Sequence, residues 1–242
     1  PCATDCSYIK EPANTILEKP SGQIYLYGEV HGNEIIYEKE LELWKSYYDK
    51  QGMRHLFVEM PYYTAEFLNL WMTAEDDIIL NELYLDWNGT AIHTEDTLDF
   101  FKEIKQQCPE TVFHGTDVGH QYYSTGERYL AYLKDNSMAE SHQYTLAEEN
   151  ITQGKLYYSR KEDAYRENML VSNFVREFES LVAVDVMGIY GADHTDINAN
   201  AYNTNSVPCM AKQLFERYGE KIYTEDLSPL ARNIEAVSYE TI

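Results

Sequence analysis

Residues 182–190 form the most hydrophobic stretch of the chain, and this stretch restricts the folds that the sequence can adopt. A strand that is apolar on both faces must be covered from both sides, which is typical of the central strand of a parallel sheet. Shorter apolar runs at residues 23–27, 54–60, 111–115 and 221–224 have the composition of further strands. Segments with helical spacing separate them, so the sequence predicts an α/β fold with a central, mostly parallel sheet flanked by helices.

Helices are predicted wherever apolar residues recur every three or four positions. We expect them over residues 34–50, around 67–72, over 76–86, from 94 to before Pro109, over 162–180 and over 207–218. Residues 125–180 show helical spacing without a convincing strand, which predicts a helical insertion between the third and fourth strands. No stretch rich in Pro, Gly or Ser divides the 242 residues, so we expect a single α/β domain over residues 1–242.

Two of the predicted strands end in the same pattern, a glycine followed three positions later by a histidine. Residues 28–31 read Gly-Glu-Val-His, and residues 191–194 read Gly-Ala-Asp-His. The second strand ends near an acidic residue, Glu59, and the third is followed by Asp117 and His120. Because ligands of open α/β sheets bind in the crevice outside the carboxyl ends of the strands, these side chains are expected to share one pocket.

Glu29 and His31 are two positions apart, so their side chains face the same side if the chain stays extended beyond the strand. A carboxylate beside an imidazole is a common general-base arrangement, because the anion favours the protonated ring and holds it in place. His194 repeats the pattern after a second buried strand, which packing alone does not readily explain. We therefore predict catalytic roles for all three, with a water-exposed histidine near a helix N-terminus as the alternative for His194.

Glu59 ends an otherwise apolar strand, where an ionised carboxylate is costly unless it is paired. A catalytic role and a salt bridge to a buried arginine are both open for it. Arg166 lies in the predicted helix over residues 162–180, and its planar guanidinium is suited to binding a substrate carboxylate or one of the site's own glutamates. The alternative for Arg166 is a surface ion pair with Asp163 or Glu162.

Asp117 and His120 are candidates for substrate binding, although Asp117 is nearly as well suited to stabilising a turn. Tyr62 and Tyr122 are also predicted to bind substrate in the same cleft. They belong to a group of tyrosines that could stack on a flat ligand, although core and rim packing would explain most of them as well. The group is Tyr27, Tyr62, Tyr63, Tyr122 and Tyr123.

The formal net charge of −22 makes two classes of partner improbable. So acidic a chain repels phosphate backbones and anionic lipid headgroups, so neither nucleic acid nor a membrane surface is expected as a partner. No apolar run approaches the roughly 20 residues that a membrane span needs. The sequence also lacks the G-x-S-x-G, P-loop, GxGxxG and HExxH motifs, which argues against serine hydrolases, kinase-like proteins, dinucleotide binders and zincins.

The four cysteines are few for a disulfide scaffold, and their spacing matches no zinc motif. Cys2 and Cys6 are close enough for a short terminal bridge, whereas Cys108 and Cys209 lie beside prolines in predicted loops, away from the strand ends. The disulfide state of all four is open. The sequence starts at Pro1 rather than Met, from which we expect an upstream segment to have been removed and the protein to be exported.

Taken in order, these elements resemble the superfamily that joins erythromycin-esterase-like proteins, Tiki and TraB-type metalloproteases, and haem-binding uptake proteins. The resemblance rests on five short segments, namely residues 28–31, Glu59, residues 115–117, residues 166–169 and residues 191–194. It implies an α/β core with helical elaboration and a pocket at the strand ends.

For the esterase-like branch, the resemblance implies that His31 activates water for attack on an ester without a metal. Glu29 and Glu59 would orient and tune His31, and His194 and Arg166 would stabilise the developing negative charge. Our leading hypothesis is therefore a hydrolase that cleaves an ester, lactone or amide of a small-molecule or peptide substrate and requires no cofactor. The substrate and the oligomeric state do not follow from the sequence.

The other branches imply two alternative functions. One is a metal-dependent, peptidase-like hydrolase in which Glu29, His31, Glu59 and His194 hold a divalent ion such as zinc or manganese. The other is a non-catalytic protein that binds haem or another small ligand in the cleft.

Overall fold

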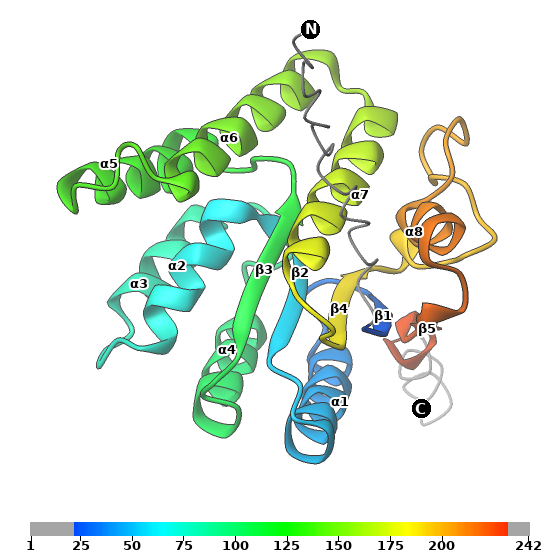
Figure 1. The fold of residues 1–242 in the computed structure, drawn as a ribbon. Coiled ribbons are helices and arrows are strands. Elements are labelled where there is room, and N and C mark those ends of the chain that lie inside the picture. Colours follow the sequence, from blue (N-terminus) through cyan, green and yellow to red (C-terminus); the bar gives the residue numbers. More distant parts are fainter. Residues whose placement is uncertain (1–21, 232–242) are drawn as a thin grey trace, which may run out of the picture.

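The structure is a computed structural model of the 242-residue chain, and it describes residues 22–231. Strands alternate with helices along the described residues (Figure 1). In chain order the elements are β1 (Ile24–Glu29), α1 (Glu34–Gln51), β2 (His55–Pro61), α2 (Tyr62–Met72), α3 (Ile78–Asp86), α4 (Glu95–Gln107), β3 (Val112–Asp117), α5 (Glu127–Asp135), α6 (His142–Arg160), α7 (Asp163–Ser180), β4 (Val186–Gly191), α8 (Met210–Tyr218) and β5 (Ile222–Asp226).

The five strands form one parallel sheet in the order β3-β2-β4-β1-β5. β4 lies at the centre, where Val186 is aligned with Ile24 of β1 on one side and with His55 of β2 on the other. The predicted α/β fold and the central place of the most hydrophobic segment are therefore confirmed. The strand is shorter than predicted, because Val182 is exposed to solvent and Ala183 has a positive φ of 54°, which breaks the extended backbone.

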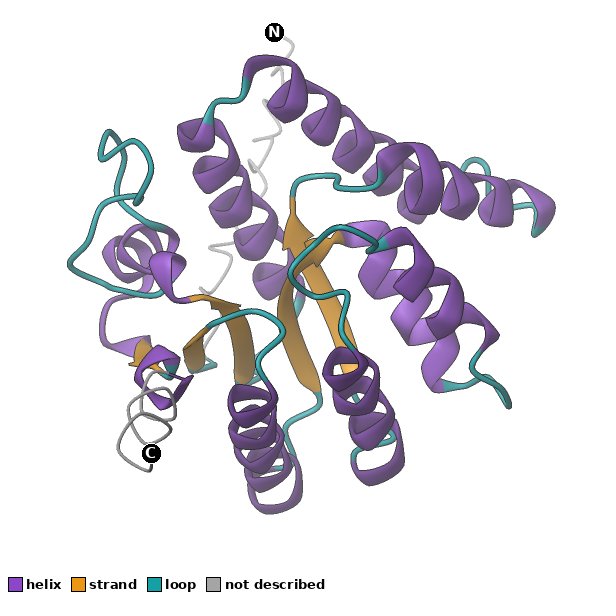
Figure 2. Ribbon diagram, turned by 180° about the vertical axis from the view of Figure 1, so that it is seen from behind, coloured by secondary structure: helices purple, strands orange, loops and turns teal. Residues whose placement is uncertain are grey.

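Helices cover both faces of the sheet, as a parallel sheet buried on both sides requires (Figure 2). On one face, α1 to α6 supply the side chains that pack around Val58 and Ile189. On the other face, α7 and α8 pack around Leu26 and Tyr190. Ile189 and Tyr190 are adjacent in β4 and belong to opposite faces, which is the two-residue period of a strand.

The connection between β1 and α1 is short and constrained at both ends. Gly32 has a positive φ of 72°, and a Cβ atom at this position would lie 2.2 Å from the carbonyl oxygen of Ala91, so a side chain does not fit. Asn33 then caps α1 by accepting a hydrogen bond from the backbone N–H of Ile36 at 3.3 Å. His31 is therefore held between the end of a buried strand and a capped helix.

Helices α5, α6 and α7 form the predicted insertion between β3 and β4 (Figure 1). Buried amide side chains tie it to the end of β3. Asn150 of α6 donates a hydrogen bond to the carbonyl oxygen of Asp117 at 2.8 Å, and Asn173 of α7 donates to that of Thr116 at 3.0 Å. Both amides also donate to the side-chain oxygen of Gln153. These contacts bring the first turns of α7 to the strand ends.

Cys108 and Cys209 are buried free thiols. The suggested bridge between Cys2 and Cys6 lies outside the described residues. Over residues 22–231, none of the helices is both long enough and apolar enough to span a membrane.

Candidate active site

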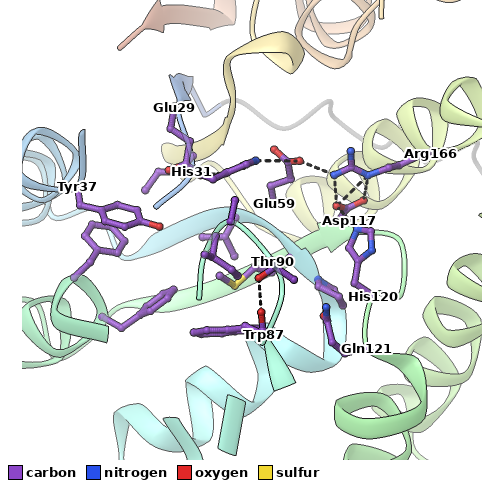
Figure 3. Close-up of a pocket in the computed structure, with 18 of the residues that line it drawn as sticks. Glu29, His31, Tyr37, Glu59, Trp87, Thr90, Asp117, His120, Gln121 and Arg166 are labelled. Atoms are coloured by element: carbon purple, nitrogen blue, oxygen red, sulfur yellow. Dashed lines mark hydrogen bonds and ion pairs between the residues drawn. The ribbon is translucent and has the colours of Figure 1, made fainter. Parts of the chain in front are cut away.

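The strand-end residues predicted from the sequence converge at the carboxyl edge of the sheet, with Glu59 at their centre (Figure 3). Oε1 of Glu59 lies 2.5 Å from Nη2 of Arg166 and 3.4 Å from Nε2 of His194. The same oxygen lies 3.8 Å from Nε2 of His31. Oε2 accepts a hydrogen bond from the backbone N–H of Gly191 at 2.6 Å. One carboxylate therefore faces groups from the connection after β1, from α7, from the last residue of β4 and from the turn that follows it.

The electrostatic surroundings keep Glu59 ionised. Burial alone would raise its pKa, but the charges of His194 and Arg166 outweigh this effect and hold the pKa well below its usual range. Of the two roles left open for Glu59, the salt bridge to an arginine is present in the structure, although the side chain of Arg166 is 21% exposed, and the carboxylate also faces both histidines.

His31 lies between two carboxylates. Its Nδ1 is 2.7 Å from Oε1 of Glu29, a hydrogen bond, while Nε2 points towards Glu59 (Figure 3). Burial lowers the pKa of His31, but the hydrogen bond to Glu29 and the charges of Glu59 and Glu29 outweigh it and raise the pKa to about 9. At pH 7 the ring is therefore an imidazolium, with roughly 1% in the neutral form.

His194 has an equivalent position between two carboxylates. It ends a short 3₁₀ turn over Ala192–His194, with Nε2 towards Glu59 and Nδ1 2.8 Å from Oε2 of Glu167. Burial lowers the pKa of His194, but the charge of Glu59 and the interaction with Glu167 raise it well above its usual range. Its side chain is only 13% exposed, so the alternative of a water-exposed histidine is not what the structure shows.

Arg166 binds the site's own carboxylates, one of the two possibilities that its sequence position left open. Nε lies 3.0 Å from Oδ1 of Asp117 and Nη2 lies 2.5 Å from Oδ2, a bidentate contact, while Nη2 also reaches Glu59. Burial lowers the pKa of Arg166, but the charges of Asp117 and Glu59 outweigh it and raise the pKa further. The surface pairing with Asp163 or Glu162 is not observed.

Asp117 lies between Arg166 and His120, and His120 in turn contacts Tyr158. All four side chains line one cavity, which is described below. Burial would raise the pKa of Asp117, but Arg166 and His120 hold it well below its usual range. Its Oδ2 is 2.9 Å from Nε2 of His120, whose Nδ1 is 2.5 Å from the Tyr158 hydroxyl. Oδ1 also accepts a hydrogen bond from the backbone N–H of Val118, directly after the strand.

The two Gly-x-x-His segments fit each other across the pairing of β1 with β4, in which Glu29 is aligned with Gly191. A Cβ atom on Gly191 would lie 3.2 Å from Nε2 of His31 and 3.3 Å from Oε2 of Glu59. A Cβ atom on Gly28 would lie 2.4 Å from Oγ1 of Thr195, directly after the second segment. Each glycine therefore leaves the space that the other segment occupies.

Two cavities meet at this cluster. One, of about 280 Å³, is lined largely by apolar side chains, including Trp87, Phe100 and Phe101. The other, of about 480 Å³, is lined largely by polar residues of the segments around β4 and α7. The residues that line both cavities are Glu29, His31, Glu59, Ala91 and Arg166.

The structure does not bring the predicted tyrosines to these cavities. Tyr62 lines a separate cavity of about 300 Å³ and packs edge-on against Tyr129, because α2 begins directly at Tyr62 and its side chain follows the packing of that helix. Tyr122 packs on Tyr123, with a ring-centroid distance of 4.2 Å. Tyr27 and Tyr63 are buried and hydrogen-bonded within the protein. The stacking group expected for a flat ligand is therefore not assembled.

Several residues at the site were not predicted from the sequence. Glu167 follows Arg166 directly in α7, and its Oε1 accepts a hydrogen bond from the backbone N–H of Met210 at the start of α8. The sequence feature that could have indicated Glu167 is its place directly after Arg166, within the segment 166–169. Glu40 of α1 is fully buried with no hydrogen-bond partner for either oxygen, and burial, with the charge of Glu29 added, raises its pKa well above its usual range. Tyr158 and the aromatic lining had no local signal.

The residues suggested as metal ligands do not fit an ion in this arrangement. Among the described residues, no group of three or more His, Cys, Asp or Glu side chains is placed to hold a metal. The oxygen of Glu59 towards which both histidines point is already in contact with the guanidinium of Arg166. A cation at that point would be repelled by Arg166.

No protein-family model matches the sequence, and no curated protein matches it either. Solved structures do share its fold. A Bacillus cereus protein superposes with a TM-score of 0.60 at 13% identity, over 85% of this chain and 65% of that one. A mutant of the erythromycin esterase EreC, in its open conformation, gives a TM-score of 0.60 at 8% identity, over 87% of this chain and 70% of that one. A succinoglycan biosynthesis protein gives a TM-score of 0.56 at 12% identity, over 84% and 65%.

These similarities show an erythromycin-esterase-like α/β fold for the described residues. The chain spans 65% of the length of the Bacillus cereus protein. At identities of 8 to 13%, the likeness concerns the fold alone.

Proposed function

We propose that this chain is a hydrolase that cleaves an ester, lactone or amide with water activated by His31. The observation that carries the proposal is the placement of His31, whose side chain lines both cavities and whose Nδ1 is held by the buried Glu29, while its Nε2 lies 3.8 Å from Glu59. A base oriented by a carboxylate, with its second nitrogen free to meet water, is the arrangement that general-base hydrolysis needs. The fold likeness to an erythromycin esterase agrees with this class of reaction.

The proposed reaction starts from the neutral form of His31. Nε2 accepts a proton from a water molecule while the water oxygen forms a bond to the substrate carbonyl carbon, and the carbonyl π electrons move to its oxygen. We assign the donor for that oxyanion to His194, an imidazolium that lies between Glu59 and Glu167. Collapse of the intermediate breaks the bond to the leaving group, which takes the proton from His31.

Arg166 has a positioning role in this proposal. Asp117 and Glu59 occupy Nε and Nη2, so the guanidinium fixes the Glu59 carboxylate between the two histidines. Within the described residues, Nη1 is the guanidinium nitrogen that remains for a hydrogen bond to substrate.

The pKa of His31 predicts an alkaline pH profile. Because His31 must lose a proton to act as the base, kcat/KM should rise about tenfold per pH unit from pH 7 and level off above about 9. Glu29→Gln removes the carboxylate that raises this pKa, so the rising limb should move to lower pH. The measurement is kcat/KM from pH 6 to 10.5 with any ester, lactone or amide that the wild type hydrolyses.

Glu38→Gln is the matched control, because Glu38 is an exposed glutamate of α1. The rising limb of the pH profile of this variant should still level off near pH 9. An unchanged limb in Glu29→Gln would show that Glu29 does not set the pKa of the base.

The raised pKa of His31 also stabilises the folded chain below pH 6.5, and this stabilisation is lost as the pH rises through 9. Circular dichroism should therefore accompany every point.

Gly191→Ala tests the space in front of Nε2 of His31. The added methyl group would lie 3.2 Å from that nitrogen and 3.3 Å from Oε2 of Glu59, where the attacking water must sit. We expect kcat/KM to fall at least tenfold while the thermal midpoint changes by only a few degrees. In Gly126→Ala the methyl group would be similarly crowded, 3.0 Å from Ile151, but outside this cluster, and activity should persist. Wild-type activity in Gly191→Ala would mean that water does not approach from this side.

A panel of esters, lactones and amides, assayed with the purified chain from pH 7 to 10.5, tests the proposal as a whole. Turnover that follows the predicted alkaline limb supports it. Absence of turnover across the panel, in a chain that is folded by circular dichroism, would overturn it.

A further inference from the structure

The two cavities that meet at His31 differ sharply in chemistry. The smaller cavity, of about 280 Å³, reaches from the ends of β2 and β4 to α4 and to the connection between α3 and α4. Most of its exposed wall is apolar and includes Val58, Trp87, Ile92, Phe100 and Ile189. Polar side chains, among them Asp117, His120 and Gln121, line the part of the wall beside Arg166. A cavity of this kind gains free energy by taking an apolar group out of water.

The larger cavity, of about 480 Å³, carries acidic side chains from α7 and from the turn after β4, namely Asp163, Glu167 and Asp193. The cationic groups that line it are each paired with carboxylates. Arg166 is bound by Glu59 and Asp117, and both histidines lie between two glutamates. Among the described lining residues, Asp163 and Asp193 have no cationic partner, so an anionic substrate group would meet these two acids and no unpaired cation.

The charge balance becomes more negative in the form that would react. Once His31 is neutral, the cluster holds two cations, Arg166 and His194, against four acidic side chains. The four are Glu29, Glu59, Asp117 and Glu167. Neutral and cationic groups are favoured beside them, and anionic groups are disfavoured.

We propose, building on the hydrolase function above, that the substrate is an amphipathic ester or amide. Its apolar alkyl or acyl part occupies the apolar cavity, its neutral or cationic polar part occupies the acidic cavity, and the scissile carbonyl lies between them at His31. The residues shared by the two cavities surround the point at which this carbonyl must sit.

The first experiment uses fatty-acid esters of glycerol with acyl chains of increasing length, with hydrolysis followed by acid release. Each methylene that enters the cavity should raise kcat/KM about fourfold, the fold-change that corresponds to about 0.8 kcal/mol per buried methylene. The increase should stop once the cavity is full. A flat series would overturn the assignment of the apolar cavity.

Ile92 provides the structural control because it is half-buried in a connection rather than in the core. Ile92→Trp should fill the cavity and shorten the preferred chain, and Ile92→Ala should lengthen it. Leu85→Trp places the same bulk at a residue that is 71% exposed and outside the cavity, and it should leave the preference unchanged. If both Ile92 variants keep the wild-type preference, the acyl chain of the substrate does not bind in this cavity.

The second experiment varies the polar half at constant acyl length, with esters of choline, glycerol and glycolate. We expect the cationic and neutral esters to be hydrolysed at least tenfold more efficiently than the anionic glycolate ester at low salt. Equal or better hydrolysis of the glycolate ester would overturn the assignment of the acidic cavity.

Binding separates failure of this inference from failure of the hydrolase proposal. Glycerol alkyl ethers cannot be hydrolysed as esters, and calorimetry should show their Kd falling about fourfold per methylene. In Ile92→Trp the preferred alkyl chain should become shorter, as expected for the esters. Ether binding with this dependence, but no turnover of any ester, would retain the cavities as binding sites and reject the hydrolase function. Ester turnover without chain-length dependence in either assay would do the reverse.

Discussion

Replacement of His31 by asparagine is expected to lower kcat/KM for hydrolysis by a factor of about 10² to 10⁴, the usual contribution of a general base. In the proposed reaction Nε2 of His31 takes the proton of the attacking water, and asparagine has no group that can do so near neutral pH. The asparagine amide can still donate a hydrogen bond towards Glu29, so the substitution removes the base while keeping a polar partner for that buried carboxylate.

The effect is measured as kcat/KM above pH 9, where the wild-type base is deprotonated. His142→Asn is the matched control, because His142 is exposed at the start of α6 and lines a different cavity, and it should retain wild-type activity. Thermal unfolding of both variants distinguishes loss of the base from loss of the fold. If His31→Asn kept wild-type activity, the role assigned to His31 would be wrong.

Replacement of Arg166 by methionine is expected to have the largest effect on stability. The guanidinium contacts the buried carboxylates of Glu59 and Asp117, and methionine leaves both charges without their arginine partner. Breaking a buried ion pair by removing one partner costs about 3–5 kcal/mol in the free energy of unfolding. Urea denaturation of the wild type and of Arg166→Met measures this difference.

A triple variant identifies the cause of that loss. If the cost comes from uncompensated charge, then adding Glu59→Gln and Asp117→Asn to Arg166→Met should recover much of the lost stability. Arg217→Met is the surface control, since Arg217 is 48% exposed where it pairs with Glu179, and it should cost at most about 1 kcal/mol. Equal losses for the buried and the surface arginine would contradict this account.

The sequence was sufficient to predict the sheet and the residues at the strand ends, because both follow from local patterns. The apolar run before Gly191 marks the central strand, and polar residues after buried strands meet at one edge of a parallel sheet. The pairing partner of Arg166 did not follow from local pattern. The partners of Arg166 depend on tertiary structure, because α7 packs against β3 and so places Arg166 beside Asp117 and Glu59.

The apolar cavity could not be predicted because its wall comes from contacts between distant elements. Trp87 and Ile92 belong to the connection between α3 and α4, and Phe100 belongs to α4. In the sequence none of the three is distinguishable from an ordinary core residue. Tyr62 shows the opposite case, since its position after a strand end suggested the cleft. The immediate start of α2 instead directs its ring towards Tyr129.

The strand order also determines when the site can form as the chain folds. β1 pairs only with β4 and β5 among the described strands, and β4 lies between β1 and β2. His31 and Glu59 are therefore synthesised well before the strand that joins them, which begins at Val186. Contacts of such long sequence separation form slowly, because loop closure must precede them. A nascent chain therefore cannot join His31 to Glu59 through the sheet until Val186 and the residues that follow it have been synthesised.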